Sequence, residues 1–331
     1  MKSSVMKSPT VVGLEKKPRA SLTTLPNYFL SSKEGIKFVS SGCTLLDCAL
    51  GNGYPVGRIV NIVGDRSTAK TGLAMEALIN FLLAYPDGRA AYRETEAAFD
   101  RRYAEAMGLP LKKVDFGPEE PLSTVEDFAR DLDKFLDERI KVGPPGIYVL
   151  DSLDALSDEA EMERDIGKGS YQMEKAKMLS TFFRKSASKI EKAQVLLIII
   201  SQVRDNIGVM FGEKSKRSGG RALDFYSSIT LWLSHIETMT KTINKVKRPI
   251  GIVIKGKCKK NKVSLPFREA EFNFLFGFGI DDVNASIDWL DEVGHLGSIT
   301  GDSPEPEIKA AVKKAWAEIE QTFLPLKPKY G

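Results

Sequence analysis

Residues 59–85 hold the feature that most constrains the fold: an apolar run, the loop GDRSTAKTG, and a segment with helical spacing. The loop follows the phosphate-binding template, in which backbone N–H groups at a helix N-terminus and a lysine hold phosphate oxygens. Gly64, Lys70 and Thr71 match that template, whereas Ala69 stands where a second glycine is expected. If that position needs a left-handed backbone, alanine costs about 1–2 kcal/mol, which a folded loop can absorb. The motif alone leaves a chance loop match open.

The chain on either side of this motif alternates apolar, strand-like runs with segments of helical spacing. Dense apolar runs followed by polar or turn residues are typical of buried parallel strands. We expect strands at 59–63, 88–93, 146–150 and 195–200. Strands that alternate with helices indicate an α/β fold, with one mostly parallel central sheet flanked by helices.

The segments between and after these strands have helical or strand patterns of their own. Ser123 with Glu126 resembles a capping box at the start of a helix. Residues 228–276 have strand character without intervening helices, so we expect them to extend the same sheet. We expect helices at 70–85, after Ser123, at about 171–193 and at 305–322.

Composition sets the broad class of the protein. The 331 residues are 42% hydrophobic and 28% charged, with a net charge of +4, as in an ordinary soluble globular protein. No apolar run approaches the roughly 20 residues that span a bilayer, so we expect a cytoplasmic protein without a membrane partner. Three scattered cysteines and two distant histidines provide neither a disulfide framework nor a zinc site.

Polar side chains follow the other predicted strands where each strand ends. Asp151 follows 146–150, Glu94 and Glu96 follow 88–93, and Gln202 follows 195–200. Ligands of such sheets bind at the carboxyl ends of the strands, next to the GDRSTAKTG loop. Taken singly, the aspartate could be a helix cap and the glutamates exposed loop residues. Their convergence on one edge of the sheet favours a nucleotide site, with a Mg²⁺-linked carboxylate and a water-activating glutamate.

Six segments strengthen this interpretation. In order between 39 and 294 they are VSSGCTLLDCALGNGYPVGRIVNIVG, AYRETEAAFDRRYAEAMGL, IYVLDSLDAL, SQVRDNIGVMFG, SGGRALDFYSSITL and KKNKVSLPFREAEF. Together they resemble the RecA family of strand-exchange ATPases. IGVMFG and the KNK triplet followed by PF are the specific signals, because a generic phosphate-loop protein would not share them.

The resemblance implies ATP and Mg²⁺ as cofactors, held between neighbouring subunits of a filament. Thr71 and Asp151 match the Mg²⁺ ligands, Glu96 the water-activating glutamate, and Gln202 the switch that reports ATP to the DNA loop. Asp100 and Tyr103 match residues that contact adenine. The matching phosphate loop comprises Gly64, Asp65, Arg66, Ser67, Thr68, Ala69, Lys70 and Thr71.

Lys260 and Lys262 match lysines that reach the ATP of the neighbouring subunit, where they would act on phosphate charge as an arginine finger does. Without the family context they would be a lysine-rich surface loop. Their role would make hydrolysis depend on filament assembly.

Two loops are expected to hold DNA. The first lies around 167–173, with Lys175 and Lys177 just beyond it, and the second covers about 204–221. Cations neutralise phosphates without reading sequence, while apolar side chains can enter the base stack. A core segment is the alternative for 209–211. The expected contacts of the second loop are Arg204, Ile207, Met210, Phe211, Lys214, Lys216, Arg217 and Arg221.

The chain departs from the family pattern at several places. Ala69 puts nucleotide affinity or turnover rate in question, and Asn206 and Lys177 replace a lysine and an arginine of the familiar bacterial members. Prolines in the first 25 residues favour an extended arm over the usual N-terminal helix, which suggests a divergent, bacteriophage-like lineage. We therefore divide the chain into a polymerisation arm at 1–38, an ATPase core at 39–277 and a small C-terminal module at 278–331.

We expect a DNA-dependent ATPase that forms filaments on single-stranded DNA and exchanges strands with homologous double-stranded DNA. Its partners would be both DNA forms, copies of itself, and a single-strand-binding or loading protein. Two alternatives stay open. One is an ATP-binding filament protein that coats or anneals DNA with little hydrolysis, which Ala69 favours. The other is a hexameric, helicase-like motor.

Overall fold

The computed structural model describes residues 35–96, 99–158, 172–205, 215–217 and 220–323. Within these residues the main sheet has ten strands: β8 (Ser215–Arg217) pairs with β7 beside one continuous path of nine. They are β3 (Ile59–Gly64), β4 (Arg89–Glu94), β5 (Val114–Asp115), β6 (Gly146–Asp151), β7 (Val195–Asp205), β9 (Ile229–Ile243), β10 (Val246–Asn261), β11 (Glu269–Leu275) and β12 (Gly279–Ile280). Their order in the sheet is β12-β11-β10-β9-β3-β7-β6-β4-β5. A separate two-stranded sheet pairs β1 (Phe38–Val39) with β2 (Tyr54–Pro55).

The sheet confirms the predicted α/β class. Strands β9, β3, β7, β6, β4 and β5 are parallel, and β10, β11 and β12 extend them with antiparallel pairs. Every residue of β3 and β6 is buried, which explains their largely apolar sequences. The one polar residue within β3, Asn61, donates to the Ile199 carbonyl and to the Ser201 hydroxyl. Strand β7 runs past its predicted end at residue 200, because its last residues pair with β8 (Ser215–Arg217).

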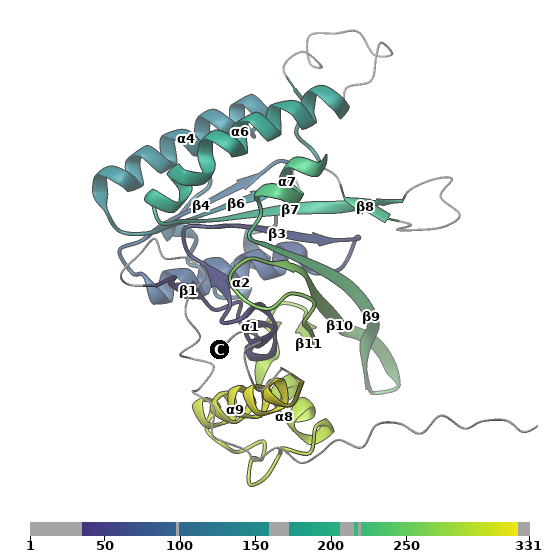
Figure 1. Cartoon of the computed structure of the whole chain (residues 1–331). Helices are drawn as coiled ribbons and strands as arrows, with labels where there is room; N and C mark the ends of the chain where they lie inside the picture. The colour runs from purple at the N-terminus through teal and green to yellow at the C-terminus, as the bar shows by residue number, and fades with distance from the viewer. Residues whose placement is uncertain (1–34, 97–98, 159–171, 206–214, 218–219, 324–331) are drawn as a thin grey trace, which may run out of the picture.

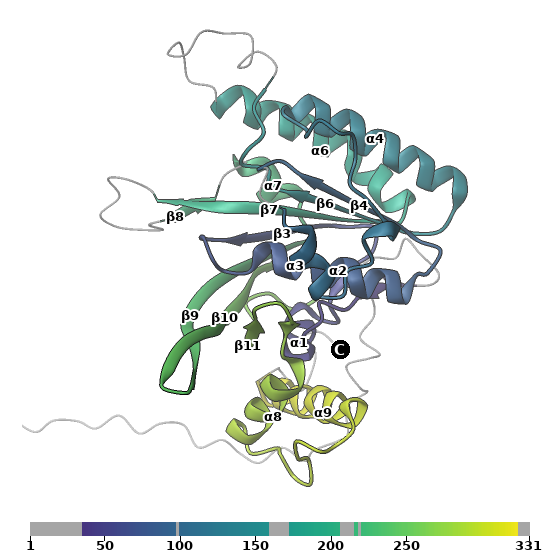
Figure 2. The same cartoon turned by 180° about the vertical axis from the view of Figure 1, so that it is seen from behind.

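Helices cover both faces of the sheet (Figures 1 and 2). One face carries α4 (Val125–Val142), α6 (Gln172–Lys192) and α7 (Gly220–Tyr226). The other carries α1 (Thr44–Leu50), α2 (Lys70–Ala84), α3 (Arg101–Ala106) and the short 3₁₀ helix η2 (Leu111–Lys113). Two buried apolar clusters fill the space between these layers, one on each side of the sheet.

The start of α4 differs from its prediction by one residue. The capping box is formed by Thr124 and Asp127: the Asp127 backbone N–H donates to the Thr124 hydroxyl, and the Asp127 carboxylate accepts from the Thr124 backbone N–H. Ser123 donates to the same carboxylate at 3.2 Å. The Ser123–Glu126 assignment was therefore wrong in register, because two hydroxyl residues precede two acidic ones and the spacing alone admits both pairings.

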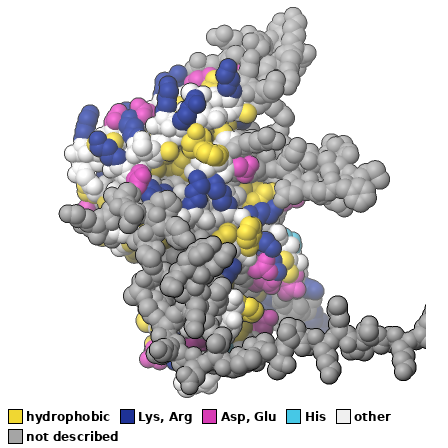
Figure 3. All heavy atoms as spheres, in the orientation of Figure 1, with side chains coloured by type: hydrophobic (Ala, Val, Ile, Leu, Met, Phe, Trp, Pro, Cys, Tyr) yellow, Lys and Arg dark blue, Asp and Glu magenta, His cyan; other side chains and the backbone are white. Residues whose placement is uncertain are grey.

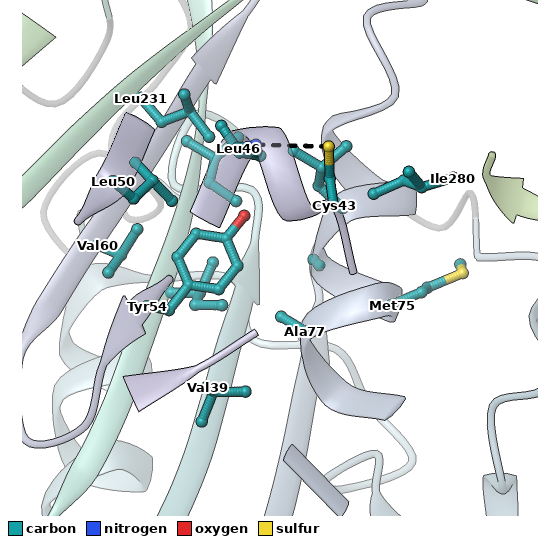
Figure 4. Close-up of a cluster of buried hydrophobic side chains, with 14 of the residues drawn as sticks. Val39, Cys43, Leu46, Leu50, Tyr54, Val60, Met75, Ala77, Leu231 and Ile280 are labelled. Atoms are coloured by element: carbon teal, nitrogen blue, oxygen red, sulfur yellow. Dashed lines mark hydrogen bonds between the residues drawn. The ribbon is translucent and has the colours of Figure 1, made fainter. Parts of the chain in front are cut away.

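The apolar cluster under α1 brings together segments that are far apart in sequence. Figure 4 shows Leu46 and Leu50 of α1 with Tyr54, Val60 and Leu231, and Cys43 with its sulfur accepting from the Leu46 backbone N–H. All three cysteines are free thiols. Burial raises the pKa of Cys48 to about 12 and that of Cys258 to about 11, so both stay protonated at neutral pH.

The C-terminal helices α8 (Asp282–Glu292) and α9 (Glu305–Phe323) pack next to α1. Asp282 accepts from the Thr44 backbone N–H at 2.6 Å and from its hydroxyl at 2.8 Å. Arg268 of the loop before β11 donates twice to Glu320 of α9, at 2.7 and 2.5 Å. The predicted tail helix is confirmed. No helix in the described part of the chain is both long and apolar enough to span a bilayer.

Candidate active site

The loop between β3 and α2 is a tight turn that ends at the N-terminus of α2, as the phosphate-binding template leads one to expect. Ala69 lies in the left-handed region, with φ 54° and ψ 31°, and Ser67 also has a positive φ of 57°. A Cβ on Gly64 would lie 2.4 Å from the Thr68 hydroxyl oxygen, so only glycine fits there. Thr68 donates to the Asp65 carbonyl at 2.8 Å, which closes the loop on itself. The loop thus leads directly into the first turn of α2, which begins at Lys70. Backbone N–H groups at such a helix N-terminus stabilise anions.

A second group joins the ends of β4, β6 and α2 around one carboxylate. The Thr71 hydroxyl and the Tyr92 hydroxyl each donate to Asp151 Oδ2 at 2.7 Å. Burial raises the pKa of Asp151, and the hydrogen bonds from Thr71 and Tyr92 oppose that rise. The two hydroxyl groups therefore favour the charged carboxylate in a place where burial disfavours it.

Lys70 lies beside this carboxylate. Its Nζ donates to the Asp65 carbonyl at 2.7 Å. Burial lowers the pKa of Lys70, and the negative charges of Asp151 and Glu96 raise it in part. A cation that is partly desolvated interacts more strongly with a phosphate than one in bulk water.

The predicted catalytic glutamate and the predicted switch glutamine touch each other. Gln202 Nε2 donates to Glu96 Oε1 at 2.8 Å, and the Ser152 hydroxyl donates to the same oxygen. The Gln202 backbone N–H donates to Asp154 at 2.7 Å. The polar ends of β4, β6 and β7 thus form one hydrogen-bonded group, as their positions in the sequence predicted.

These side chains suit a magnesium nucleotide. Magnesium prefers oxygen ligands and is usually held by one or two carboxylates together with phosphates and water. Thr71 and Asp151 supply a hydroxyl and a carboxylate at the tip of α2 and β6. Within the described residues there is no cluster of three or more His, Cys, Asp or Glu side chains that could hold a metal ion without a nucleotide.

Asp100 and Tyr103, which are expected to contact the adenine base, lie at the start of α3. Asp100 is the N-cap of α3 and accepts from the backbone N–H groups of Arg102 and Tyr103. Tyr103 is partly buried against the apolar cluster on the α2 side of the sheet. Their contact with adenine stays a prediction.

Lys260 and Lys262 lie together at the C-terminal end of α7. Lys262 donates to the Phe225 carbonyl at 2.8 Å, and Lys260 donates to the same carbonyl at 3.0 Å and to that of Asp224. Cations are stabilised at such helix ends, where carbonyl groups lack partners within the helix. The pair is therefore attached to the helix that follows the expected second DNA loop.

The expected DNA contacts are only partly visible. Lys175 donates to the carbonyls of Leu153 and Leu156, and Lys177 is exposed on α6. The backbone places Arg204 on β7, Lys216 and Arg217 on β8, and Arg221 on α7. Residues 167–171 of the first loop, and Ile207, Met210, Phe211 and Lys214, lie outside the described residues.

Sequence reasoning missed three contributors to the site. The Tyr92 hydroxyl donates to Asp151, and the Ser152 hydroxyl donates to Glu96. The Thr95 hydroxyl donates to the Ser152 carbonyl at 2.8 Å and accepts from the Ser152 backbone N–H at 2.9 Å. Tyr92 precedes Glu94 by two residues and so lies on the same face of β4. That spacing was the signal that could have found it.

Comparison with known proteins agrees with this geometry. The family model described as the RecA N-terminal domain matches residues 20–281. Protein RecA of a Synechococcus species is 34% identical over 264 residues, which cover 80% of this chain and 66% of that protein. Protein RecA of a Nostoc species is 33% identical over 261 residues, 79% of this chain and 69% of that protein. Protein RecA of Arthrospira platensis is 34% identical over 264 residues, 80% of this chain and 68% of that protein.

Proposed function

Because the chain belongs to the RecA family, we propose that it is a DNA-dependent ATPase that forms filaments on single-stranded DNA and catalyses homologous pairing and strand exchange. It acts in the cytoplasm of a bacterial or phage-infected cell, on single-stranded DNA and homologous duplex, with copies of itself as its main partner. A single-strand-binding or loading protein is a further expected partner.

The observation that carries the proposal is the hydrogen-bonded group at the strand ends. The Asp151 carboxylate accepts hydrogen bonds from the hydroxyl groups of Thr71 and Tyr92. The Glu96 carboxylate accepts hydrogen bonds from the Ser152 hydroxyl and the Gln202 side-chain amide. A phosphate loop alone indicates nucleotide binding. A carboxylate held beside it by two donors can also orient or deprotonate a water molecule.

We assign each residue of the site a role that its contacts support. When bound, Mg²⁺ neutralises phosphate charge, and Thr71 and Asp151 would hold it. Lys70 exchanges the Asp65 carbonyl for outer phosphate oxygens, and Glu96 acts on the attacking water. The Gln202 side chain ties that glutamate to β7, the strand that leads to the expected second DNA loop.

Coupling between DNA and hydrolysis would run along this strand. Gln202 bonds Glu96 through its side chain and Asp154 through its backbone, and three residues later β7 ends at Asp205. A change of loop position on DNA would move the end of β7, and with it the donor that orients Glu96.

Joint-molecule formation tests the proposal and separates it from both alternatives. Circular single-stranded DNA is incubated with homologous linear duplex and ATP, with heterologous duplex as the control. The account predicts homology-dependent joint molecules and helical filaments under the electron microscope. Closed rings that unwind duplex would favour the hexameric motor. Equal action of ATP and a non-hydrolysable analogue, without phosphate release, would favour the coating protein.

A further inference from the structure

Lys175 has surroundings that differ from those of other lysines on α6. Figure 3 shows Lys and Arg side chains over α4 and α6 mixed with acidic ones. Lys189 of α6, for example, pairs with two aspartates of α4, at 2.5 and 2.9 Å. A face of mixed charge is what solubility alone produces. Lys175 donates to two backbone carbonyls, that of Leu153 at 3.1 Å and that of Leu156, in the loop that follows β6.

The position of Lys175 in its helix is unfavourable for a cation. It lies in the first turn of α6, where the helix dipole favours negative charge. Its side chain is half-buried, so the ammonium group loses part of its hydration. The two carbonyl groups offset these costs, because hydrogen bonds from an ionised donor are the strong ones. Lys177, two residues further along α6, is exposed. The sequence predicts the same role for both lysines, but the structure gives them different surroundings.

The loop bound by this lysine carries side chains of the candidate active site. Residues 152–156, which we call the β6 loop, read SLDAL. Both leucines are buried in the apolar cluster that includes residues of α4 and α6. The Ser152 hydroxyl donates to Glu96, and Asp154 accepts from the Gln202 backbone N–H at 2.7 Å. One side of the β6 loop is therefore held by α6, and its other side contacts the glutamate expected to act on water.

The backbone of the β6 loop is also bonded to the ends of the neighbouring strands. The Thr95 hydroxyl, directly after β4, bonds both the carbonyl and the backbone N–H of Ser152, at 2.8 and 2.9 Å. The Leu153 backbone N–H donates to the carbonyl of Ile200 in β7 at 3.1 Å. A shift of this loop would move the serine hydroxyl relative to the carboxylate that accepts from it. The hydrogen bonds from Lys175 oppose such a shift.

We propose that Lys175 is a positioning residue of the ATPase site: it holds the β6 loop so that Ser152 orients Glu96 toward the attacking water. This role replaces the DNA contact expected from the sequence, because the ammonium group binds carbonyl groups of its own chain. Since α6 begins at Gln172, directly after residues 167–171 of the expected first DNA loop, Lys175 joins the start of that helix to the site. The role rests on the proposed function, since it presupposes ATP hydrolysis.

The test compares Lys175→Met with wild type, with Lys177→Met and with Lys185→Met, all within α6. Methionine is a good helix former, so each substitution removes the cation and leaves the helix. Phosphate release is measured over a range of ATP and single-stranded DNA concentrations, and DNA binding is measured by fluorescence anisotropy at several salt concentrations. For Lys175→Met we expect kcat to fall by about tenfold, because small displacements of reacting groups slow turnover strongly. The KM for ATP, the DNA affinity and its salt slope should stay at wild-type values.

The control variants separate this role from DNA contact and from loss of charge in general. Lys177→Met should bind single-stranded DNA more weakly, with a salt slope smaller by about 0.7 for one lost phosphate contact. Lys185→Met, at an exposed position further along α6, should match wild type in both measurements. Lys175→Arg keeps the charge and the donors and should retain most of the turnover. Thermal unfolding checks that each variant is folded, and Lys175→Gln replaces Lys175→Met, with the same expectation, if the latter is not.

A double-mutant cycle tests whether Lys175 acts through Ser152. Ser152→Ala removes the hydroxyl that donates to Glu96 and should also lower kcat. If Lys175 positions that hydroxyl, Lys175→Met/Ser152→Ala should be no slower than Ser152→Ala alone, whereas independent effects would multiply. Multiplied losses would overturn the proposal, as would a wild-type kcat in Lys175→Met. That kcat together with a smaller salt slope would make Lys175 a DNA contact. A wild type that binds single-stranded DNA but releases no phosphate would refute the proposed function, and the role of Lys175 with it.

Discussion

To hold Mg²⁺ as proposed, Asp151 has to be ionised although it is buried. It is only 9% exposed, and its pKa is raised first by burial. Thr71 and Tyr92 donate to one oxygen of its carboxylate and so favour the ionised form. The site therefore maintains its negative charge with neutral donors, which leaves the positive charge of Lys70 available for phosphate.

Replacement of Tyr92 by phenylalanine tests this arrangement. Removing the hydroxyl removes a donor to the charged form, so the pKa of Asp151 rises further. A hydrogen bond to a charged group contributes about 1.5–3 kcal/mol, and one pKa unit corresponds to about 1.4 kcal/mol. We expect the acidic limb of the pH profile of ATP hydrolysis to move up by about one unit.

The matched control is Tyr148→Phe. Tyr148 is equally buried, and its hydroxyl donates to Asp131 at 2.7 Å on the other face of the sheet. This variant should lose stability without moving the pH profile. If both variants shift the profile equally, or neither does, the role given to Tyr92 is wrong.

The positions of the site residues could be predicted from sequence, but their mutual contacts could not. An apolar strand followed by a polar residue fixes which side chains reach the nucleotide edge, as for Asp151 and Gln202. Side-chain contacts depend on the register between strands that are distant in sequence, so Ser152 and Thr95 were missed. A left-handed backbone at Ala69 could be expected from the sequence only conditionally, because the loop template has glycine at that position.

Among the elements, α2 is positioned by an unusually close approach to the sheet. A Cβ on Gly72 would lie 2.3 Å from the ring of Phe274, a buried residue of β11. That contact fixes the start of α2, and therefore Lys70 and Thr71, against the antiparallel part of the sheet. The last glycine of GDRSTAKTG thus packs α2 against the sheet, whereas Gly64 accommodates the loop itself.

Gly72→Ala should destabilise the protein although it improves helix propensity. Alanine gains about 1 kcal/mol over glycine inside a helix, whereas overpacking a core costs about 1–3 kcal/mol. We expect a net loss of about 1 kcal/mol in the free energy of unfolding, measured by urea denaturation. In a Phe274→Leu background the same substitution should be neutral or stabilising. Stabilisation of the wild-type background by Gly72→Ala would contradict the packing argument.

Predictions of whole elements succeeded where the pattern was long and failed at the ends. The period of apolar residues located α2 and α4, since each buries one face over several turns. The end of β7 could not be predicted, because its last residues are stabilised by β8, which follows nine residues that the structure does not describe. Neighbouring polar residues also left the cap of α4 ambiguous.

At the scale of the whole molecule, the site is expected to be completed by a neighbouring copy. Lys260 and Lys262 bind the carbonyls at the end of α7 in their own chain. To reach the ATP of a neighbour they must leave those carbonyls. The helix that follows the second DNA loop would thus control when the lysines are available.

Mixing two inactive variants tests action between subunits. Lys260→Ala/Lys262→Ala should bind nucleotide but lose DNA-stimulated hydrolysis, and Lys70→Ala should lose hydrolysis altogether. In a filament with head-to-tail interfaces, an equal mixture places intact lysines beside an intact phosphate loop at roughly a quarter of the interfaces. We expect phosphate release to recover to that extent. No recovery, in filaments shown to contain both variants, would mean that the lysines act within their own chain.

The most direct measurement of the central claim is phosphate release from ATP with and without single-stranded DNA, for wild type and for Lys70→Ala. The strand-end group and the Lys70 ammonium predict release that rises strongly when DNA is added to wild type. They predict none from the variant under either condition. DNA-stimulated release that persists undiminished in Lys70→Ala, or wild-type release that ignores DNA, would contradict the account.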